Sequence, residues 1–315
     1  MDTIKKSGSR QTLLSGTALL ICLALSKLIL HWATSGGYGY FRDEFYYIAV
    51  SQRLQFGYLE FPPMIAFITA FTRLVLGESL FALRFFPAVA GALIVLLTGL
   101  MARELGGGRF AQILAALAVL VAPIFLTMNS MLTMDSFDEL WWVLAAYIVI
   151  RILKRDVPKL WLVFGLVAGL GLMTKITMLY FGAALVIGLL LTPSRQVLAS
   201  KWLWLGGLLA FSFLLPYIGW EFANGWPTLE FWKMYATGKT YPVTPVEFLL
   251  QQIIVLHPLT LPLWLAGLGY YIFSKDGRAF RPLGIAYVIL FVALMAMRAK
   301  NYFLAPALIC PDGIG

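Results

Sequence analysis

The sequence is poor in charge and in cysteine. Of its 315 residues, 12% are Asp, Glu, Lys or Arg, about half of the roughly 25% that soluble domains carry. This scarcity excludes an ordinary soluble domain, and 61% hydrophobic residues with a mean hydropathy of +0.84 indicate a membrane protein. The two cysteines, Cys22 and Cys310, provide neither a disulfide framework nor a metal-binding motif.

The net charge of +9 is a second feature that needs an explanation. Nucleic-acid binding proteins collect basic residues in one stripe or patch. Here the basic residues are scattered between apolar segments, as expected for the cytoplasmic loops of a polytopic membrane protein. We therefore expect membrane lipids around the chain and no nucleic-acid partner.

Apolar segments approaching the roughly 20 residues needed to cross a bilayer core recur along the chain. We predict an all-α polytopic membrane protein with about nine transmembrane helices in a single domain, 1–315. The spans are 12–32, 81–102, 110–128, 138–153, two short helices within 160–192, 202–220, 248–273 and 283–297. Residues 62–77 are also apolar, but this segment is short and contains Arg73, so we interpret it as interfacial or re-entrant.

The basic flank Lys5, Lys6 and Arg10 places the N-terminus in the cytoplasm under the positive-inside rule. With this orientation, 14 of the 24 basic residues lie inside and 10 of the 15 acidic residues lie outside. The predicted location is the plasma (inner) membrane. The first loop, 33–80, is predicted to lie at the outer face of this membrane and to contain short juxtamembrane helices. Lys175 is predicted to lie at the same face, at the tip of the hairpin within 160–192.

The first outer loop holds an unusual concentration of charge between aromatic residues. Arg42, Asp43 and Glu44 follow the first span, and Glu60 precedes two prolines. Because the chain has so few charged residues, their concentration in one outer loop indicates a functional site there. The loop contributes two segments, 41–47 and 57–63, to a longer pattern. Three further segments follow along the chain: 133–136, 169–175 and 300–306.

These five segments resemble the integral-membrane GT-C glycosyltransferases, in particular the family 39 branch of dolichyl-phosphate-mannose protein mannosyltransferases and aminoarabinose transferases. The resemblance implies transfer of a sugar from a polyprenyl-phosphate carrier to a lipid, glycan or protein acceptor at the outer face. It assigns the catalytic carboxylate to Asp43 and matches Glu60 to the acid before the prolines. Phe61 stands where the aminoarabinose transferases have a lysine, which argues against a lipid-A-specific role. Family members are commonly longer, so we expect residues 310–315 to be the end of a truncated chain.

The chemistry is consistent with this resemblance. A sugar on a phosphate already has a good leaving group, so the reaction needs a base for the acceptor and cations for the released phosphate. We predict Asp43 as the base in an inverting displacement, with Glu60 positioning the substrates and Glu44 orienting the motif. Candidate substrate-binding residues are Arg42, Asp135, Lys175, His257, Lys300 and Tyr302. No cofactor is certain, although Asp43 and Glu60 could hold a divalent cation.

Each of these residues also has a structural interpretation. Asp43 could be the N-cap of a helix beginning near Glu44, and Ser136 with Glu139 has the spacing of a capping box. Lys175 and Lys300 could complement a helix end or reach the interface, and His257 could pack between helices.

Two other functions remain open from the sequence. A transporter or flippase of a lipid-linked sugar would show internal repeats and broken helices with charges at the middle of the membrane. No repeat is visible, and the charges gather at the outer edge. A non-catalytic fragment is the third alternative.

Overall fold

The computed structural model describes residues 2–237, 243–300 and 302–304, and within these ranges every regular element is a helix. Asn301 and residues 305–315, which complete the 300–306 motif and the chain end discussed above, lie outside the described residues. The elements are α1 (Asp2–Thr34), α2 (Arg42–Ser51), α3 (Met64–Leu76), α4 (Leu80–Glu104), α5 (Arg109–Val121), α6 (Pro123–Met128), α7 (Met134–Arg155), α8 (Leu160–Thr174), α9 (Met178–Leu190), η1 (Pro193–Ala199), α10 (Lys201–Ala223), α11 (Pro227–Thr237), α12 (Pro245–Leu256), η2 (Pro258–Thr260), α13 (Leu261–Phe273), η3 (Asp276–Phe280) and α14 (Arg281–Ala296). The all-α prediction is confirmed.

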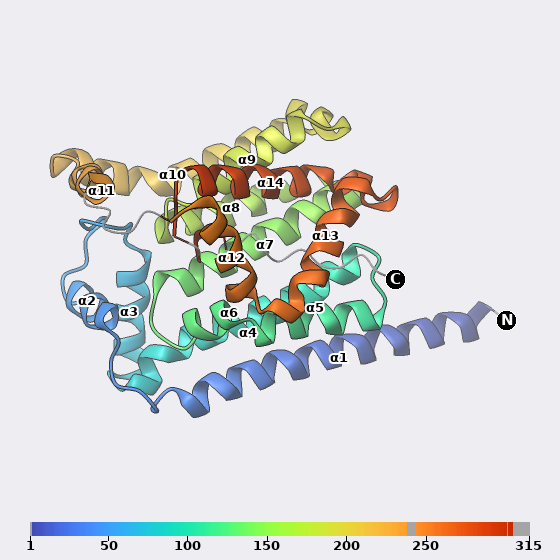
Figure 1. The fold of residues 1–315 in the computed structure, drawn as a ribbon, viewed down its shortest axis with the longest axis horizontal. Coiled ribbons are helices and arrows are strands. Elements are labelled where there is room, and N and C mark those ends of the chain that lie inside the picture. The colour runs from blue at the N-terminus through green and yellow to red at the C-terminus, as the bar shows by residue number, and fades with distance from the viewer. Residues whose placement is uncertain (1, 238–242, 301, 305–315) are drawn as a thin grey trace.

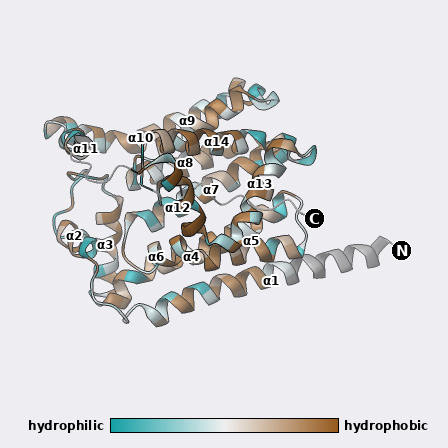
Figure 2. Ribbon diagram, in the orientation of Figure 1, coloured by the Kyte–Doolittle hydropathy of each residue, from teal (hydrophilic) through white to brown (hydrophobic). Residues whose placement is uncertain are grey.

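The long helices lie roughly side by side, and the short helices α2, α3 and α11 gather at one end of the bundle, at the left of Figure 1. The N-terminus lies at the opposite end (Figure 1). Apolar residues dominate the helices along their lengths (Figure 2). The first loop therefore forms a separate layer across one end of the bundle, as a layer outside a membrane would.

Glycine allows α8 and α10 to pack with their backbones in contact. A Cβ atom on Gly165 would lie 2.2 Å from the carbonyl oxygen of Gly206, and one on Gly206 would lie 2.1 Å from that of Trp161. Small residues at such positions permit close helix association where lipid replaces water. A Cβ atom on Gly171 would lie 2.5 Å from the Met178 side chain of α9, so glycine also allows close contact inside the 160–192 hairpin.

The predicted spans are recovered in part. Within the described ranges, four helices are long and apolar enough to cross a membrane: Gly16–Thr34, Leu80–Glu104, Lys201–Ala223 and Asp276–Ala296. The number rises to six if each of two bent helix pairs counts as one span. The chain is a multi-pass membrane protein, and the count of nine remains a prediction.

Two predicted spans are broken, which the apolar pattern did not indicate. Residues 248–273 form α12 and α13 with a bend of 92° between them. His257, at φ 81°, ends α12, and Pro258, which has no N–H to donate, follows it. Similarly, Pro123 separates α5 from α6 within 110–128. The two short helices predicted within 160–192 are confirmed as α8 and α9, with Lys175 in the turn between them.

Candidate active site

Charged groups from five parts of the chain meet at the end of the bundle that carries α2. They come from the start of α2, the loop before α3, the start of α7, the turn between α8 and α9, and the segment after α14. These groups lie close enough to shift one another's pKa values. The pKa of Glu60 is affected by the charges of Asp43, Arg42 and Lys300, and that of Tyr302 by the charges of Asp135, Lys175 and Lys300. Folding thus brings together residues that are up to 260 positions apart, from Arg42 to Tyr302.

The phenol of Tyr47 lies near several carboxylates of this charged cluster. Its side chain, on the buried face of α2, is 3% exposed. Burial raises the pKa of its phenol, and the negative charges of Asp135, Asp43 and Glu60 raise it further. Carboxylates from three separate segments therefore act electrostatically on this one phenol. The sequence analysis did not single out Tyr47, although it stands within the 41–47 motif.

Asp43 lies in the first turn of α2 but does not cap it. The N-cap residue is Phe41, so the interpretation of Asp43 as the N-cap is wrong. Its Oδ1 accepts a hydrogen bond of 3.0 Å from Nε of Arg42, and its side chain is 38% exposed. The carboxylate is therefore open to a ligand, and its one described ion-pair partner, Arg42, is itself highly exposed.

Glu44 is one residue further along and has a very different environment. Its side chain is fully buried and forms a bidentate ion pair with Arg84 of α4, with both N–O distances 2.8 Å. The backbone N–H groups of Phe41 and Leu132 donate to it at 2.8 and 2.9 Å. Burial alone would raise the pKa of Glu44, but these hydrogen bonds and the charge of Arg84 hold that pKa below its ordinary value. Both carboxylate oxygens of Glu44 are therefore already occupied by protein donors.

Arg84 is the second half of this arrangement, and the sequence analysis missed it. Besides Glu44, it donates to the backbone carbonyls of Ser35 at 2.5 Å and Gly39 at 2.9 Å. One guanidinium thus fixes the chain between α1 and α2 as well as α2 itself. The available signal was an arginine inside an apolar span, because ionisable residues at such positions are functional candidates by default.

Glu60 is exposed in the loop before α3. Burial and the nearby charge of Asp43 raise the pKa of its carboxyl, while Arg42 and Lys300 lower it, and the net direction is upward. The next residue, Phe61, is 2% exposed and packs against the rings of Tyr47 and Tyr58, with centroids 5.4 and 5.5 Å away. An apolar anchor thus occupies the place where the aminoarabinose transferases have a lysine.

Asp135 and Lys175 form the second ion pair of the cluster. Lys175 Nζ lies 2.5 Å from Oδ1 of Asp135, and the two side chains are 14% and 17% exposed. Burial alone would lower the pKa of Lys175, but the negative charges around it, with Asp135 first, raise it overall. The ammonium also lies 4.6 Å from the ring centroid of Phe303, so it remains a protonated, partly desolvated cation.

The segment after α14 adds Lys300 and Tyr302. Lys300 is exposed, and its Nζ lies 5.7 Å from the ring centroid of Tyr302. Burial and the charge of Asp135 raise the pKa of the Tyr302 phenol, while Lys175 and Lys300 act in the opposite direction. The Nζ atoms of Lys175 and Lys300 therefore lie 5.4 and 5.7 Å from the centroid of the Tyr302 ring.

The start of α7 differs from the predicted capping box. Thr133 is the N-cap, and its hydroxyl accepts from the Asp135 N–H at 3.2 Å. Ser136 instead donates to the Met128 carbonyl at 2.6 Å, and Glu139 is buried within the helix. The capping-box interpretation of Ser136 and Glu139 is therefore wrong. The helix begins three residues earlier than this capping box would place it, which puts Asp135 in its first turn, in contact with Lys175.

His257 has a local structural role. Its Nδ1 accepts a hydrogen bond of 3.3 Å from the Leu259 N–H, which stabilises the break between α12 and α13. Within the part of the chain that the structure describes, no contact links His257 to the charged cluster.

A metal site is not evident among the described residues. No group of three or more His, Cys, Asp or Glu side chains there is arranged to hold a metal ion. Asp43 and Glu60 influence one another, but no third ligand accompanies them, so a cation between these two residues remains a prediction.

Comparison with known proteins supports the fold and the family. Residues 60–220 match the sequence profile of the family described as dolichyl-phosphate-mannose-protein mannosyltransferase. No curated protein matches the chain as a whole.

Several solved structures share the fold at low sequence identity. The crystal structure of ArnT from Cupriavidus metallidurans bound to undecaprenyl phosphate superposes with a TM-score of 0.74 at 18% identity, covering 92% of this chain and 58% of ArnT. The Archaeoglobus fulgidus oligosaccharyltransferase in complex with zinc and sulfate gives 0.60 at 16% identity, with coverages of 95% and 48%. The oligosaccharyltransferase AglB from the same organism, in complex with an inhibitory peptide and a dolichol-phosphate, gives 0.58 at 14% identity, with coverages of 95% and 49%. The fold is therefore the GT-C fold, and the chain spans about half to three fifths of the length of these proteins.

Proposed function

Because the chain belongs to the dolichyl-phosphate-mannose-protein mannosyltransferase family, we propose that it transfers a sugar from a polyprenyl-phosphate carrier to an acceptor at the outer face of the plasma membrane. The acceptor is a lipid, a glycan or a protein. The similarity to ArnT with undecaprenyl phosphate and to AglB with dolichol-phosphate supports a lipid-phosphate donor. The N-terminus lies in the cytoplasm in this proposal, which follows the distribution of basic residues.

The observation that carries the proposal is the meeting of Asp43 and Glu60 with Lys175 and Lys300 at one end of the bundle. Transfer from a phosphate carrier requires this combination. Cations stabilise the negative charge that accumulates on the departing phosphate, and a nearby carboxylate accepts the proton of the acceptor.

Asp43 is the proposed general base. Of the two adjacent acids, Glu44 uses its oxygens to bind Arg84 and backbone N–H groups, whereas Asp43 is partly exposed at the edge of the cluster. The acceptor oxygen attacks the anomeric carbon and gives its proton to Asp43. The bond from that carbon to the phosphate oxygen breaks on the opposite side, and its electron pair leaves with the carrier phosphate. This displacement inverts the anomeric configuration.

Glu60 and the lysines complete the assignment. Glu60 lies close enough to Asp43 for the Asp43 charge to raise its pKa, and in this proposal it positions the sugar or the acceptor. Lys300 is exposed and lies beside Tyr302, where its positive charge contributes to the binding of a phosphate in this proposal. Lys175 uses one ammonium hydrogen for Asp135 and retains two others, because a lysine ammonium has three donors.

The test is sugar transfer in sealed proteoliposomes, using the full-length protein, a radiolabelled polyprenyl-phosphate sugar and membrane extract as the acceptor source. We expect Asp43→Asn to lower turnover by about 10²–10⁴-fold, which is the usual contribution of a general base. Glu78→Gln is the matched control, because Glu78 is an exposed acid of the same loop, paired with Arg73. Unchanged turnover in Asp43→Asn would remove the base assignment, and label that crosses the bilayer without being transferred would favour a flippase.

A further inference from the structure

Three buried polar side chains join the end of α10 to the start of α11. The hydroxyl of Thr228, in the first turn of α11, donates a hydrogen bond of 2.6 Å to Oε1 of Glu221, and the Thr228 N–H donates one of 3.3 Å to Oε2. Tyr217 in turn donates to the Thr228 hydroxyl at 2.9 Å. We call these three residues the α10–α11 corner. All three are buried, and donors of this kind offset the cost of removing a carboxylate from water.

The corner stabilises its own two helices, because a carboxylate is favourable beside the free N–H groups at the start of a helix. It also makes a contact outside them. The Thr228 hydroxyl lies 3.3 Å from the backbone carbonyl oxygen of Tyr58, which is 170 residues earlier in the chain. Tyr58 belongs to the loop between α2 and α3, and Figure 1 shows α11 at the same end of the bundle as these helices. The corner therefore touches the loop that carries Glu60.

The same loop lies directly on the last turns of α10. A Cβ atom on Gly57 would lie 2.3 Å from the Trp220 ring and 2.9 Å from the Tyr217 ring, so glycine is required for this close approach. Nε1 of Trp220 donates a hydrogen bond of 2.8 Å to Oε1 of Gln55. Tyr217, Trp220 and Glu221 have the i, i+3, i+4 spacing of one helix face. One face of α10, together with Thr228, thus contacts the loop at three successive points.

Glu60 lies between two anchored residues of this loop. The backbone N–H of Tyr58 donates to the carbonyl of Phe61 at 3.1 Å, and the buried Phe61 ring packs against the Tyr58 ring. Residues 58–61 therefore form a closed turn on which Glu60 is exposed. The charged or titratable groups coupled to Glu60 come from α2 and from the segment after α14: Asp43, Arg42, Tyr46, Tyr47 and Lys300.

We propose that Thr228 and Glu221 are positioning residues, which hold the loop so that Glu60 stands beside Asp43. They act through the backbone of Tyr58, with Gly57 seated on the adjacent rings of α10. The proposal rests on the proposed function for the role of Glu60, but the position of Glu60 can be measured without turnover. It also gives α10 and α11 a task at the site, although none of the five sequence motifs includes either helix.

Replacing Thr228 by Val removes the hydroxyl and preserves the shape of the side chain. In the wild-type protein, burial and the charge of Asp43 raise the pKa of Glu60. When the loop loosens, Glu60 moves away from both influences, so its pKa should fall towards the ordinary value of 4.5. Thr228→Ser keeps the hydroxyl and should retain the wild-type pKa.

Carboxyl modification measures this pKa at one residue. The full-length protein in detergent is treated with a water-soluble carbodiimide and an amine at a series of pH values, because the protonated carboxyl is the reactive form. Mass spectrometry of the peptide that contains Glu60 then gives the pH at which half of the maximal modification rate remains. We expect this midpoint to be lower in Thr228→Val than in the wild-type protein.

Two matched controls and a second variant accompany this measurement. Thr192 is also a buried threonine, but its hydroxyl donates to the Leu189 carbonyl beyond α9, so Thr192→Val should keep the wild-type midpoint. Gly57→Ala pushes the loop away from the Trp220 ring and leaves the corner's own hydrogen bonds in place, so it should lower the midpoint even if Thr228→Val fails to fold. Gly39→Ala, where a Cβ meets no atom within 4 Å, is its control in the same outer loop.

Sugar transfer separates this proposal from the proposed function. We expect Thr228→Val to lower kcat/KM by about 10²-fold, which is the effect of misplacing a reacting geometry by about 1 Å, and Thr228→Ser to restore it. A wild-type midpoint in Gly57→Ala and in folded Thr228→Val would overturn the positioning role, whatever happens to transfer. A lowered midpoint with unchanged transfer would support the positioning role and instead overturn the function proposed for Glu60.

Discussion

Replacing Glu44 by Gln tests whether the buried ion pair with Arg84 holds the first loop in place. The change preserves shape but removes the charge from a side chain that accepts two hydrogen bonds from Arg84 and one each from Phe41 and Leu132. Breaking one partner of a buried, well-bonded ion pair costs about 3–5 kcal/mol. We expect this cost in the free energy of opening α2, because Glu44 links α2 to α4 and to the start of α7.

Hydrogen exchange of the α2 amides measures this opening free energy directly. Since about 1.4 kcal/mol corresponds to a factor of ten, a loss of about 3–5 kcal/mol predicts exchange faster by about 10²–10³·⁶-fold. Glu78→Gln is again the control, because an exposed pair contributes under about 1 kcal/mol and its loss should change exchange by about fivefold or less. Equal exchange rates in the two variants would refute the role assigned to Glu44.

The pH dependence gives an independent check on the same pair. The pKa of Glu44 in the folded protein is below its ordinary value of 4.5. A lowered folded pKa means that the stabilisation is fully present above the unfolded value and is lost as the pH falls through the folded one. The opening free energy of α2, obtained from exchange rates divided by the intrinsic rate at each pH, should therefore fall below about pH 4.5 in the wild type, and Glu44→Gln should lack this fall.

Three further predictions concern the rest of the chain. Arg42→Gln should raise the pKa of Glu60, because the Arg42 charge lowers it; the acid limb of the pH–rate profile should then move to higher pH, and an unmoved limb would exclude Glu60 as the titrating group. Gly206→Ala should lower the thermal unfolding midpoint in detergent, because its Cβ would lie 2.1 Å from a backbone oxygen, whereas Gly207→Ala, with no atom within 4 Å, should not. Thr133→Ala should cost about 0.5–2 kcal/mol of stability through the lost N-cap of α7, and Thr133→Ser should restore it.

Much of the site was predictable because the signals are local. Asp43, Glu60, Asp135, Lys175 and Lys300 stand in short motifs whose order along the chain suggested one face, and the structure brings them together at one end of the bundle. The resemblance to the GT-C family is confirmed by the matched profile and the shared fold. The roles of these residues in catalysis remain predictions.

Other features depended on partners that no local pattern identifies. The motif distinguished Asp43 from Glu44 in role, but only the position of Arg84, forty residues later, shows that Glu44 is buried and occupied while Asp43 is partly exposed. Ser136 and Glu139 had the correct spacing for a capping box. In the structure, however, α7 begins at Met134 with Thr133 as its N-cap, and the Ser136 hydroxyl donates to the carbonyl of Met128.

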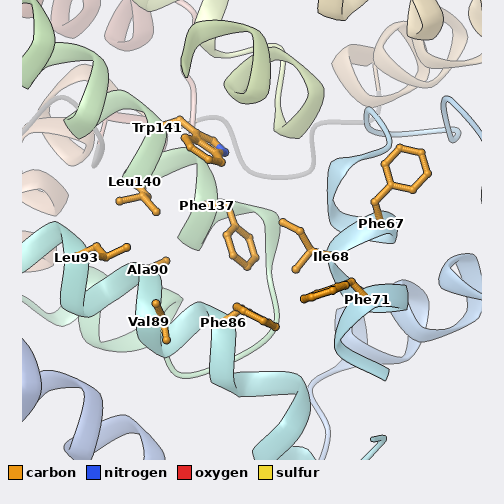
Figure 3. Close-up of a pocket in the computed structure, with 10 residues that line it drawn as sticks. All are labelled: Phe67, Ile68, Phe71, Phe86, Val89, Ala90, Leu93, Phe137, Leu140 and Trp141. Carbon is orange, nitrogen blue, oxygen red and sulfur yellow. The ribbon is translucent and has the colours of Figure 1, made fainter. Parts of the chain in front are cut away.

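The sequence by itself determined that this protein is helical and crosses a membrane, and it predicted that most of its carboxylates lie on the outer side. Hydropathy, and the cost of placing charge in lipid, act on each segment separately. The tertiary structure decided which acid is exposed, where α12 breaks, and that α3, α4 and α7 line an apolar pocket (Figure 3). Those outcomes depend on packing between segments that are far apart in the chain, and no single segment contains them.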